Sequence, residues 1–249
     1  MHRLPLARID ALFLDAGNTL VGMNLDLICE RLAAHGVHAT PAAVERAEAG
    51  ARPALSRLLA TGRSSEARDT FVAHVHNTLA GLGDAATYAH PTDAALAEVA
   101  HAVAHELKDA GTRRLWSRVL PGVPEALAEL RAAGVKLAVV SNSDGTIEAG
   151  LEQAGLREHI DAVFDSQLVG FEKPDPRIFT HALEVVRSAP ERTAHLGDLH
   201  AVDVLGARAA GIHGVLVDPY DEWRDDDCPR TASTAALARA LLAARAAVK

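Results

Sequence analysis

Polar side chains that could bind a metal ion and a phosphoryl group follow the apolar runs of this 249-residue chain. In chain order they are Asp15, Ser141, Asn142, Lys173, Asp198 and Asp203. Two or three converging carboxylates repel each other unless a hard cation such as Mg²⁺ lies among them. A hydroxyl, backbone N–H groups and an ammonium can hold phosphoryl oxygens, and an aspartate facing the phosphorus can attack it. The set therefore indicates metal-assisted phosphoryl transfer.

Each of these residues also has a simpler explanation when it is taken alone. An aspartate after a strand is often a helix N-cap, and Ser141 and Asn142 could cap the helix predicted from Gly145. A single lysine such as Lys173 is usually a surface charge. Their joint order favours a site, because ligands bind beyond the carboxyl ends of the strands in an open α/β sheet.

The elements that would position these residues form an α/β pattern. Short β-branched runs alternate with amphipathic helical stretches, which predicts a doubly wound parallel sheet with helices on both faces. The predicted strands are 11–15, 136–141, 161–165, 194–198 and 213–218. The predicted helices are 123–133, 145–154, 176–187, 202–210 and 232–248. Between the last strand and the last helix, the acidic loop 220–229 is expected to be solvated.

A helical segment interrupts this pattern after the first strand. Residues 25–34, 41–59, 66–82 and 93–109 show helical periodicity, with Pro41 and Pro91 at helix starts. The sequence therefore predicts two domains. Residues 1–21 and 114–249 form the α/β core, and residues 22–113 form an inserted helical bundle.

Composition and net charge argue against several classes of protein. The formal net charge of −8 argues against nucleic acid or an anionic membrane as a partner. No apolar run approaches the ~20 residues of a membrane span, and the N-terminus lacks the apolar region of a signal peptide. Cys29 and Cys228 have no metal-ligand spacing. We expect a cytoplasmic protein, as a monomer or homodimer.

Four motifs in order resemble those of the haloacid dehalogenase-like (HAD) hydrolase superfamily. They are LDAGNTL at 14–20, VVSNS at 139–143, EKPDPRIF at 172–179 and HLGDLHAVD at 195–203. The resemblance covers the whole core and implies a Rossmann-like fold. Residues 22–113 resemble the small helical cap of the branch that contains phosphoglycolate phosphatase-like enzymes and haloacid dehalogenases.

The resemblance implies a nucleophile and a metal site. Asp15 would attack the phosphorus. Mg²⁺ would be held by the carboxylates of Asp15 and Asp198 and by the backbone carbonyl of Gly17. Asp203 would support the metal indirectly, through the residues around it.

The resemblance also implies a phosphate site and an activity. Ser141 and Lys173 would hold the phosphoryl oxygens, assisted by Asn142 and by backbone amides from Ala16 to Asn18. The implied reaction is Mg²⁺-dependent hydrolysis of a small phosphorylated metabolite through an aspartyl phosphate on Asp15.

One residue departs from the family pattern. Most phosphatases of this superfamily have a second aspartate two positions after the nucleophile, where this chain has Gly17. That aspartate is a general acid and base, and such a group contributes ~10²–10⁴-fold to the rate. The substrate could therefore carry a good leaving group, such as an acyl phosphate, or the acid could come from the cap. Candidate histidines for this role are His74, His76 and His90.

Gly17 leaves other functions open. Haloacid dehalogenases resemble this chain but carry an aromatic residue at this position and lack the Gly197-Asp198 pair. Phosphonate cleavage uses a cap lysine, and Lys108 is the only lysine near the cap. A sugar-phosphate mutase depends on the absent acid. The chain could also be a catalytically weak or inactive protein that binds a phosphate ligand or interacts with another protein, although such a protein would have no use for the nucleophile Asp15.

Overall fold

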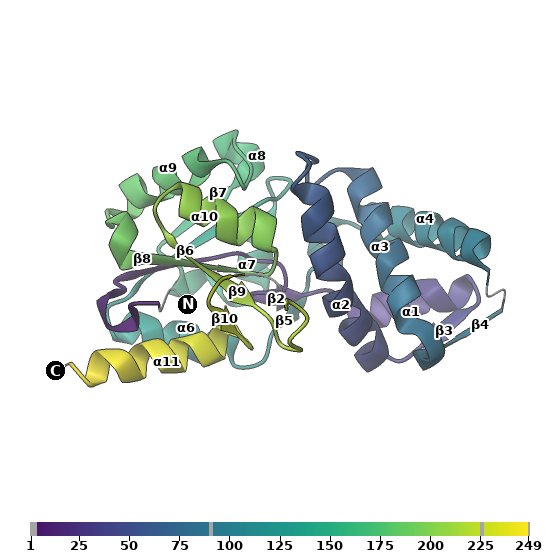
Figure 1. Ribbon diagram of the computed structural model, residues 1–249, viewed down its shortest axis with the longest axis horizontal. Coiled ribbons are helices and arrows are strands. Elements are labelled where there is room, and N and C mark those ends of the chain that lie inside the picture. Colours follow the sequence, from purple (N-terminus) through teal and green to yellow (C-terminus); the bar gives the residue numbers. More distant parts are fainter. Residues whose placement is uncertain (1–3, 90–91, 225–226, 249) are drawn as a thin grey trace. The chain divides into compact units, whose positions relative to one another are not determined.

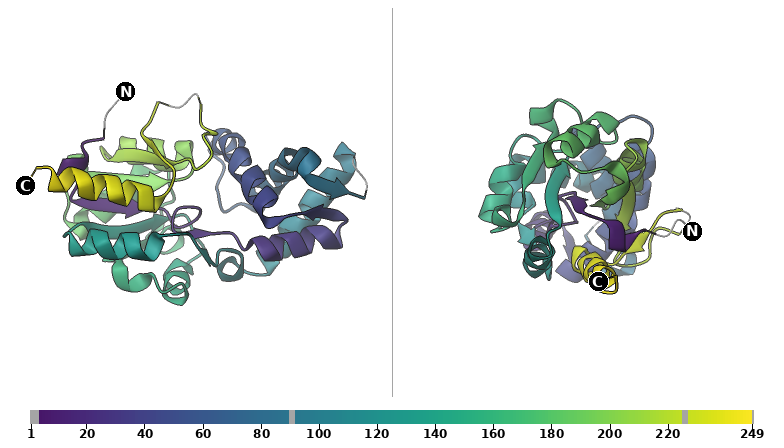
Figure 2. Two further views of the ribbon diagram at one scale, coloured as in Figure 1. Left: turned by 90° about the horizontal axis from the view of Figure 1, so that it is seen from below. Right: turned by 90° about the vertical axis from the view of Figure 1, so that its left-hand side faces the viewer.

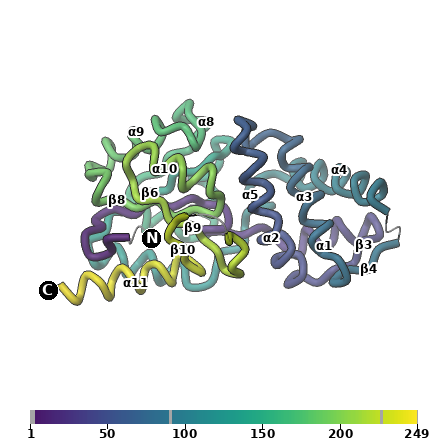
Figure 3. The backbone as a smooth tube through the Cα atoms, in the orientation of Figure 1, coloured from purple at the N-terminus to yellow at the C-terminus, as the bar shows by residue number. Residues whose placement is uncertain are grey.

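The computed structural model describes residues 4–89, 92–224 and 227–248. The predicted helix start at Pro91 and the candidate His90 lie outside these residues. The chain folds into two compact units, Met1–Gly22 with Ser117–Lys249, and Met23–Trp116. It leaves the first unit after Gly22 and returns at Ser117 (Figure 3).

A parallel sheet forms the centre of the first unit. Within the described residues it has six strands in the order β10-β9-β8-β1-β6-β7 (Figure 1). They are β1 (Ala11–Leu14), β6 (Lys136–Ser141), β7 (Ala162–Asp165), β8 (Thr193–Gly197), β9 (His213–Val217) and β10 (Arg230–Thr231). The predicted doubly wound α/β fold is confirmed, and the five predicted strands are present with small shifts at their ends.

Helices cover both faces of this sheet. Every residue of β1 is buried, as expected for a strand covered on both sides. Ala11 and Phe13 pack against α9 and α10 through Phe179 and Ala207. Seen from below, α6 and α11 lie in front of the other face (Figure 2). The helices are α6 (Val123–Ala132), α7 (Ile147–Gln153), α8 (Ser166–Val169), α9 (Pro176–Val186), α10 (Leu205–Ala209) and α11 (Thr234–Ala246).

Short elements complete the first unit. The two connections to the second unit pair as antiparallel strands, β2 (Val21–Gly22) with β5 (Arg118–Val119). Single turns of 3₁₀-helix occur at η1 (Leu6–Arg8), η3 (Arg157–His159) and η4 (Pro190–Arg192). The sequence did not predict these elements, because two or three residues are too few to show a period.

Two predictions for this unit are wrong. The predicted helix 202–210 is divided into a π-helical segment, η5 (His200–Val204), and α10. The loop 220–229 is not wholly solvated, because the side chain of Trp223 is 3% exposed and packs against Leu216 and Cys228. Burying a large aromatic side chain stabilises the fold enough to hold an otherwise acidic loop against the core.

The second unit is helical, as predicted. Its helices are α1 (Leu25–Ala34), α2 (Pro41–Leu59), α3 (Arg68–Leu82), α4 (Asp93–Asp109) and the short α5 (Thr112–Leu115). Two strands that the sequence did not predict, β3 (Val37–Ala39) and β4 (Ala86–Tyr88), pair antiparallel, and η2 (Gly83–Ala85) precedes β4. The predicted domain boundaries and the role of this unit as a cap stay predictions. Among the described residues, no helix has the length and apolar character that a membrane span requires.

A buried charged cluster lies between α2 and α3. Glu48 accepts hydrogen bonds from Arg52 Nε at 3.0 Å, and His74 Nε2 lies 3.1 Å from Glu48 Oε1. All three side chains are buried. Burial alone would raise the pKa of Glu48, but the charge of Arg52 and the hydrogen bond from His74 lower this pKa to about 2 from 4.5.

The Glu48→Gln substitution tests the contribution of this cluster to stability. It removes the carboxylate that faces the buried Arg52, so we expect the free energy of unfolding at pH 7 to fall by about 3–5 kcal/mol. Because the pKa of Glu48 is lower in the folded chain, its contribution is fully present above the unfolded pKa of 4.5 and is lost as the pH falls toward about 2. Urea unfolding of both proteins at a series of pH values measures the difference.

Glu98→Gln is the matched control, because Glu98 is an exposed carboxylate of the same unit. Its effect should stay within about 0.5 kcal/mol. A difference between wild type and Glu48→Gln that does not shrink below pH 4.5 would contradict the assigned pKa of Glu48.

Candidate functional site

Three neighbouring strands bring the predicted site residues to one edge of the sheet. Asp15 follows β1, Ser141 is the last residue of β6, and Asp198 follows β8. In the sheet β1 lies between β8 and β6, and all three run parallel. The carboxyl ends of adjacent parallel strands meet at the same edge, so residues far apart in the sequence become neighbours.

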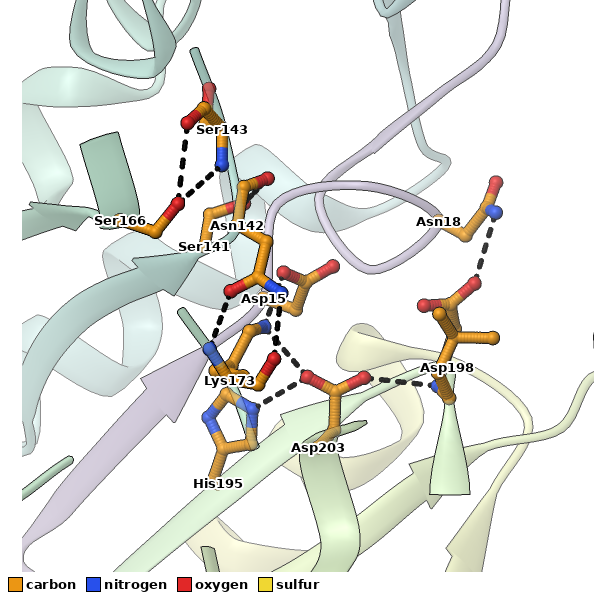
Figure 4. Close-up of polar contacts among 11 residues, drawn as sticks. Asp15, Asn18, Ser141, Asn142, Ser143, Ser166, Lys173, His195, Asp198 and Asp203 are labelled. Atoms are coloured by element: carbon orange, nitrogen blue, oxygen red, sulfur yellow. Dashed lines mark hydrogen bonds and ion pairs between the residues drawn. The ribbon is translucent and has the colours of Figure 1, made fainter. Parts of the chain in front are cut away.

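A buried ammonium joins two of the predicted carboxylates. Lys173 Nζ lies 2.6 Å from Asp15 Oδ1 and 2.7 Å from Asp203 Oδ1 (Figure 4). The exposed fractions of Lys173, Asp15 and Asp203 are 3%, 8% and 1%. Such short, charge-assisted hydrogen bonds in a buried place fix both partners in position. The contact with Lys173 uses Oδ1 of Asp15.

The position of the Asp203 side chain is fixed by the close packing of η5 against β8. Its Oδ2 accepts a hydrogen bond from the backbone N–H of Leu199 at 3.0 Å. A Cβ atom on Gly197 would lie 2.1 Å from Asp203 Cγ, so only glycine fits at that position. The π-helical geometry of η5 brings Asp203 back toward β8, and such segments are frequent at functional sites.

His195 is part of this network, and the sequence analysis did not select it. His195 Nε2 lies 3.0 Å from Asp203 Oδ1, and its ring packs edge-on against Phe179 at 4.9 Å between centroids. The side chain is fully buried, on the face of the sheet that also carries Phe13. A histidine inside an otherwise apolar strand, three residues before Asp198, is the signal that could have identified it.

Asn142 contacts the backbone of Lys173. Its Nδ2 donates to the Lys173 carbonyl at 2.9 Å, and the Lys173 N–H donates to its Oδ1 at 2.7 Å. Ser141 is buried at the end of β6 and lies with Asn142 near Asp15 (Figure 4). The roles of Ser141 and Asn142 as phosphate ligands stay predictions.

The loop after β1 also contacts the predicted metal ligand Asp198. Asn18 has a φ of 52° and donates from Nδ2 to Asp198 Oδ2 at 3.0 Å. Asparagine is one of the few residues other than glycine that adopts this conformation readily. The sequence pattern indicated a role only for the backbone of Asn18, and the structure adds this side-chain contact.

The charges in this site alter each other's protonation. Burial raises the pKa of Asp15 above its ordinary value, and the charge of Asp203 raises it further, while Lys173 opposes both effects. Burial alone would lower the pKa of Lys173, but the two carboxylates raise it, so its ammonium stays protonated. Burial alone would raise the pKa of Asp203, but Lys173 and His195 together lower this pKa by more. Asp203 therefore stays ionised.

The donor atoms suit a hard cation, although side chains alone do not complete a metal site. Among the residues that the structure describes, no three acidic, imidazole or thiol groups are close enough to hold an ion. Both oxygens of Asp203 accept hydrogen bonds from the protein. Asp15, Asp198 and the Gly17 carbonyl remain as oxygen donors. Mg²⁺ typically binds through one or two carboxylates and keeps several waters, so these residues fit it.

The second unit contains the described histidines and the lysine that the sequence offered as catalytic groups of a cap. His74 is held by Glu48 in the buried cluster, and His76 is half-buried. Lys108 lies 3.7 Å from Glu66 and over the ring of Phe71. Each of these contacts lies within this unit.

Comparison with known proteins agrees with the sequence motifs. A sequence model of the haloacid dehalogenase-like hydrolases matches residues 9–211. Haloacid dehalogenase-like hydrolase domain-containing protein 3 of Bos taurus is 44% identical over 126 residues, which are 49% of this chain and 50% of that protein. Phosphoserine phosphatase of Thermus thermophilus is 43% identical over 119 residues, which are 46% of this chain and 47% of that protein. The chain spans about half the length of the curated relatives it matches.

A solved structure shares the fold. The HAD-hydrolase YfnB from Bacillus subtilis, whose structure is described as bound to magnesium, aligns with a TM-score of 0.62. The alignment covers 94% of this chain and 99% of that chain at 18% identity. At this identity the likeness shows a common fold alone.

The His195→Phe substitution tests the newly found member of the network. It removes a donor to the buried Asp203 while it keeps an aromatic ring in the strand. Lys173 and the Leu199 N–H still bind Asp203 in this variant. We therefore expect the free energy of unfolding at pH 7.5 to fall by about 1.5–3 kcal/mol, the usual contribution of one hydrogen bond to a charged group. Urea unfolding measures the change.

His213→Phe is the control, because His213 lies on the adjacent strand β9 and is less deeply buried. Its effect should stay within about 0.5 kcal/mol. An equal fall in the free energy of unfolding of the two variants would show that the contact of His195 with Asp203 does not stabilise the fold.

Proposed function

The chain belongs to the haloacid dehalogenase-like hydrolases, and on that premise we propose that it is a Mg²⁺-dependent phosphatase that hydrolyses a small phosphorylated metabolite. The observation that carries the proposal is the buried contact of Asp15 with Lys173 at the carboxyl edge of the sheet. A non-catalytic binding protein has no need of an aspartate held in this way. Three matched relatives are named as phosphatases, of phosphoserine, ribulose-1,5-bisphosphate and glyceraldehyde 3-phosphate.

The proposed reaction begins at Asp15. Lys173 holds Oδ1, so Oδ2 is the oxygen that attacks the phosphorus. The bond from phosphorus to the substrate's leaving oxygen breaks, that oxygen departs with the electron pair, and Asp15 becomes an aspartyl phosphate. The Ser141 hydroxyl and the Lys173 ammonium bind phosphoryl oxygens and stabilise the charge that develops on them. Attack of water on the phosphorus then releases phosphate and regenerates the Asp15 carboxylate.

Asp15, Asp198 and the Gly17 carbonyl would hold Mg²⁺. When bound, Mg²⁺ supplies positive charge that offsets the negative charge of the phosphoryl oxygens. Asp203 contributes through Lys173 and the backbone of Leu199 rather than by direct contact. The raised pKa of Asp15 is a further reason for a cation here, because an added positive charge favours the ionised form of that carboxyl.

Gly17 and Lys173 limit the kind of leaving group that the substrate can carry, because neither residue can readily protonate it. Gly17 has no side chain to protonate a departing oxygen. Lys173 is a poor acid, because two carboxylates bind its ammonium and raise its pKa. The proposed substrates therefore carry leaving groups that depart without a proton, such as acyl or aryl phosphates. An acid supplied by residues 22–113, the proposed cap, is the alternative source of the proton.

The Asp15→Asn substitution tests the nucleophile. Because the amide is a far weaker nucleophile than the carboxylate, we expect turnover of an aryl phosphate in Mg²⁺ to fall to background. Steady-state assays measure this, with EDTA abolishing wild-type activity and added Mg²⁺ restoring it. Asp10→Asn is the control, since Asp10 is a half-exposed carboxylate at the opposite end of the same strand. Full activity in Asp15→Asn, or chloride released from 2-chloropropionate, would refute the proposal.

The Gly17→Asp substitution tests the missing acid. Gly17 does not adopt a positive φ, so an L side chain introduces no backbone strain there. We expect hydrolysis of an alkyl phosphate to rise by about 10²-fold, the lower end of what a general acid contributes, with a smaller change for an aryl phosphate. The ratio of kcat/KM for the two substrates is the measurement. An unchanged ratio would show that a proton donor other than residue 17 already serves the wild type.

A further inference from the structure

We infer that the Asn142 side chain is a positioning residue, which holds the backbone of Lys173 rather than the substrate. The inference rests on the proposed function only for its effect on turnover. The contact itself lies wholly within the first unit, between the end of β6 and the loop that joins α8 to α9.

The geometry of the contact is a two-point attachment. Asn142 Oδ1 accepts from the Lys173 N–H at 2.7 Å, and Asn142 Nδ2 donates to the Lys173 carbonyl at 2.9 Å. One carboxamide thus satisfies both backbone polar groups of one residue. Two bonds from a rigid plane fix orientation as well as distance, which a single hydrogen bond does not. The donor and acceptor pattern of the backbone also determines which end of the carboxamide faces which group.

The backbone around Asn142 is held in place by contacts of the residues before and after it. Ser141 is paired in register with Asp165 of β7, and the backbone of Ser143 exchanges two hydrogen bonds with the Ser166 hydroxyl, at 3.1 and 3.2 Å. Asn142 is therefore held between two fixed residues at the end of a central strand. A side chain on a rigid element positions its partner more accurately than one on a loop.

The other partner, Lys173, needs such support. It lies in a loop, yet its ammonium must reach Asp15 Oδ1 and Asp203 Oδ1 at once. A lysine side chain is flexible, so its ammonium stays in place only if the backbone at the other end is also fixed. Asn142 fixes the backbone, and the two carboxylates fix the ammonium. An Asn142 side chain engaged in this way acts on the phosphoryl group through Lys173.

Hydrogen exchange at the Lys173 amide tests the contact without any assay of activity. In wild-type protein this amide should exchange slowly, because it donates to Asn142. Asn142→Ala should speed its exchange by about tenfold or more, the effect of losing a net hydrogen bond. Asn142→Asp keeps the accepting oxygen, so exchange should stay close to wild type. Ser141→Ala, at the preceding position, is the control and should leave this amide unchanged. Unchanged exchange in Asn142→Ala would overturn the inference.

A double-mutant cycle with Lys173→Met tests the route of the effect, because methionine keeps the backbone that Asn142 holds but has no ammonium to be positioned. We expect Asn142→Ala to lower kcat/KM for an aryl phosphate by about tenfold in wild type and by less than about twofold in the Lys173→Met background, because coupled residues are not additive. Equal reductions in both backgrounds would show that Asn142 binds the substrate itself and would overturn the inference. If the wild type hydrolyses no phosphate at all, the proposed function fails, while the exchange experiment still decides whether Asn142 holds Lys173.

Discussion

The Lys173 ammonium between two buried carboxylates is the interaction on which the rest of this structure depends. Burial raises the pKa of both Asp15 and Asp203, and the charge of Lys173 opposes that effect in each, so the ammonium favours the ionised form of both carboxyls. Other groups hold the network in place: His195 and the Leu199 N–H bind Asp203, and the Gly197 position leaves room for it. A strictly structural role would be served as well by apolar packing, so this arrangement supports the proposal that Asp15 is the nucleophile.

The sheet brings these groups together from distant parts of the sequence. Lys173 and Asp15 are 158 residues apart. They meet because Asn142, at the end of β6, binds the backbone of Lys173, and β6 is the strand next to β1. This topology explains how the sequence could indicate which polar residues lie together at one edge of the sheet. Apolar, β-branched runs that end in Asp15 and Ser141 reveal both the strands and the polar residues at their carboxyl ends. The bounds of α1, α2 and α4 were equally predictable, since a capping side chain precedes each of them.

What the sequence could not predict depends on contacts between side chains and on very short elements. His195 lies inside a strand, where residue type alone does not distinguish a network member from a buried ring. The direction of the Asn142 carboxamide depends on a backbone partner 31 residues away. The strands β3 and β4 have too few residues to show alternation. The π-helical turn before α10 arises from close packing against Gly197, which no periodicity reveals.

The most direct test of the central claim is to trap the intermediate. Wild-type protein in Mg²⁺ would be mixed with an aryl phosphate, quenched in acid during turnover, digested and examined by mass spectrometry for a phosphorylated peptide. We predict a phosphoryl group on Asp15, absent when that residue is replaced by asparagine. In ¹⁸O water the label should enter the released phosphate and not the Asp15 carboxylate, because water attacks phosphorus. A phosphoryl group on another residue, or label in the Asp15 carboxylate, would contradict this account.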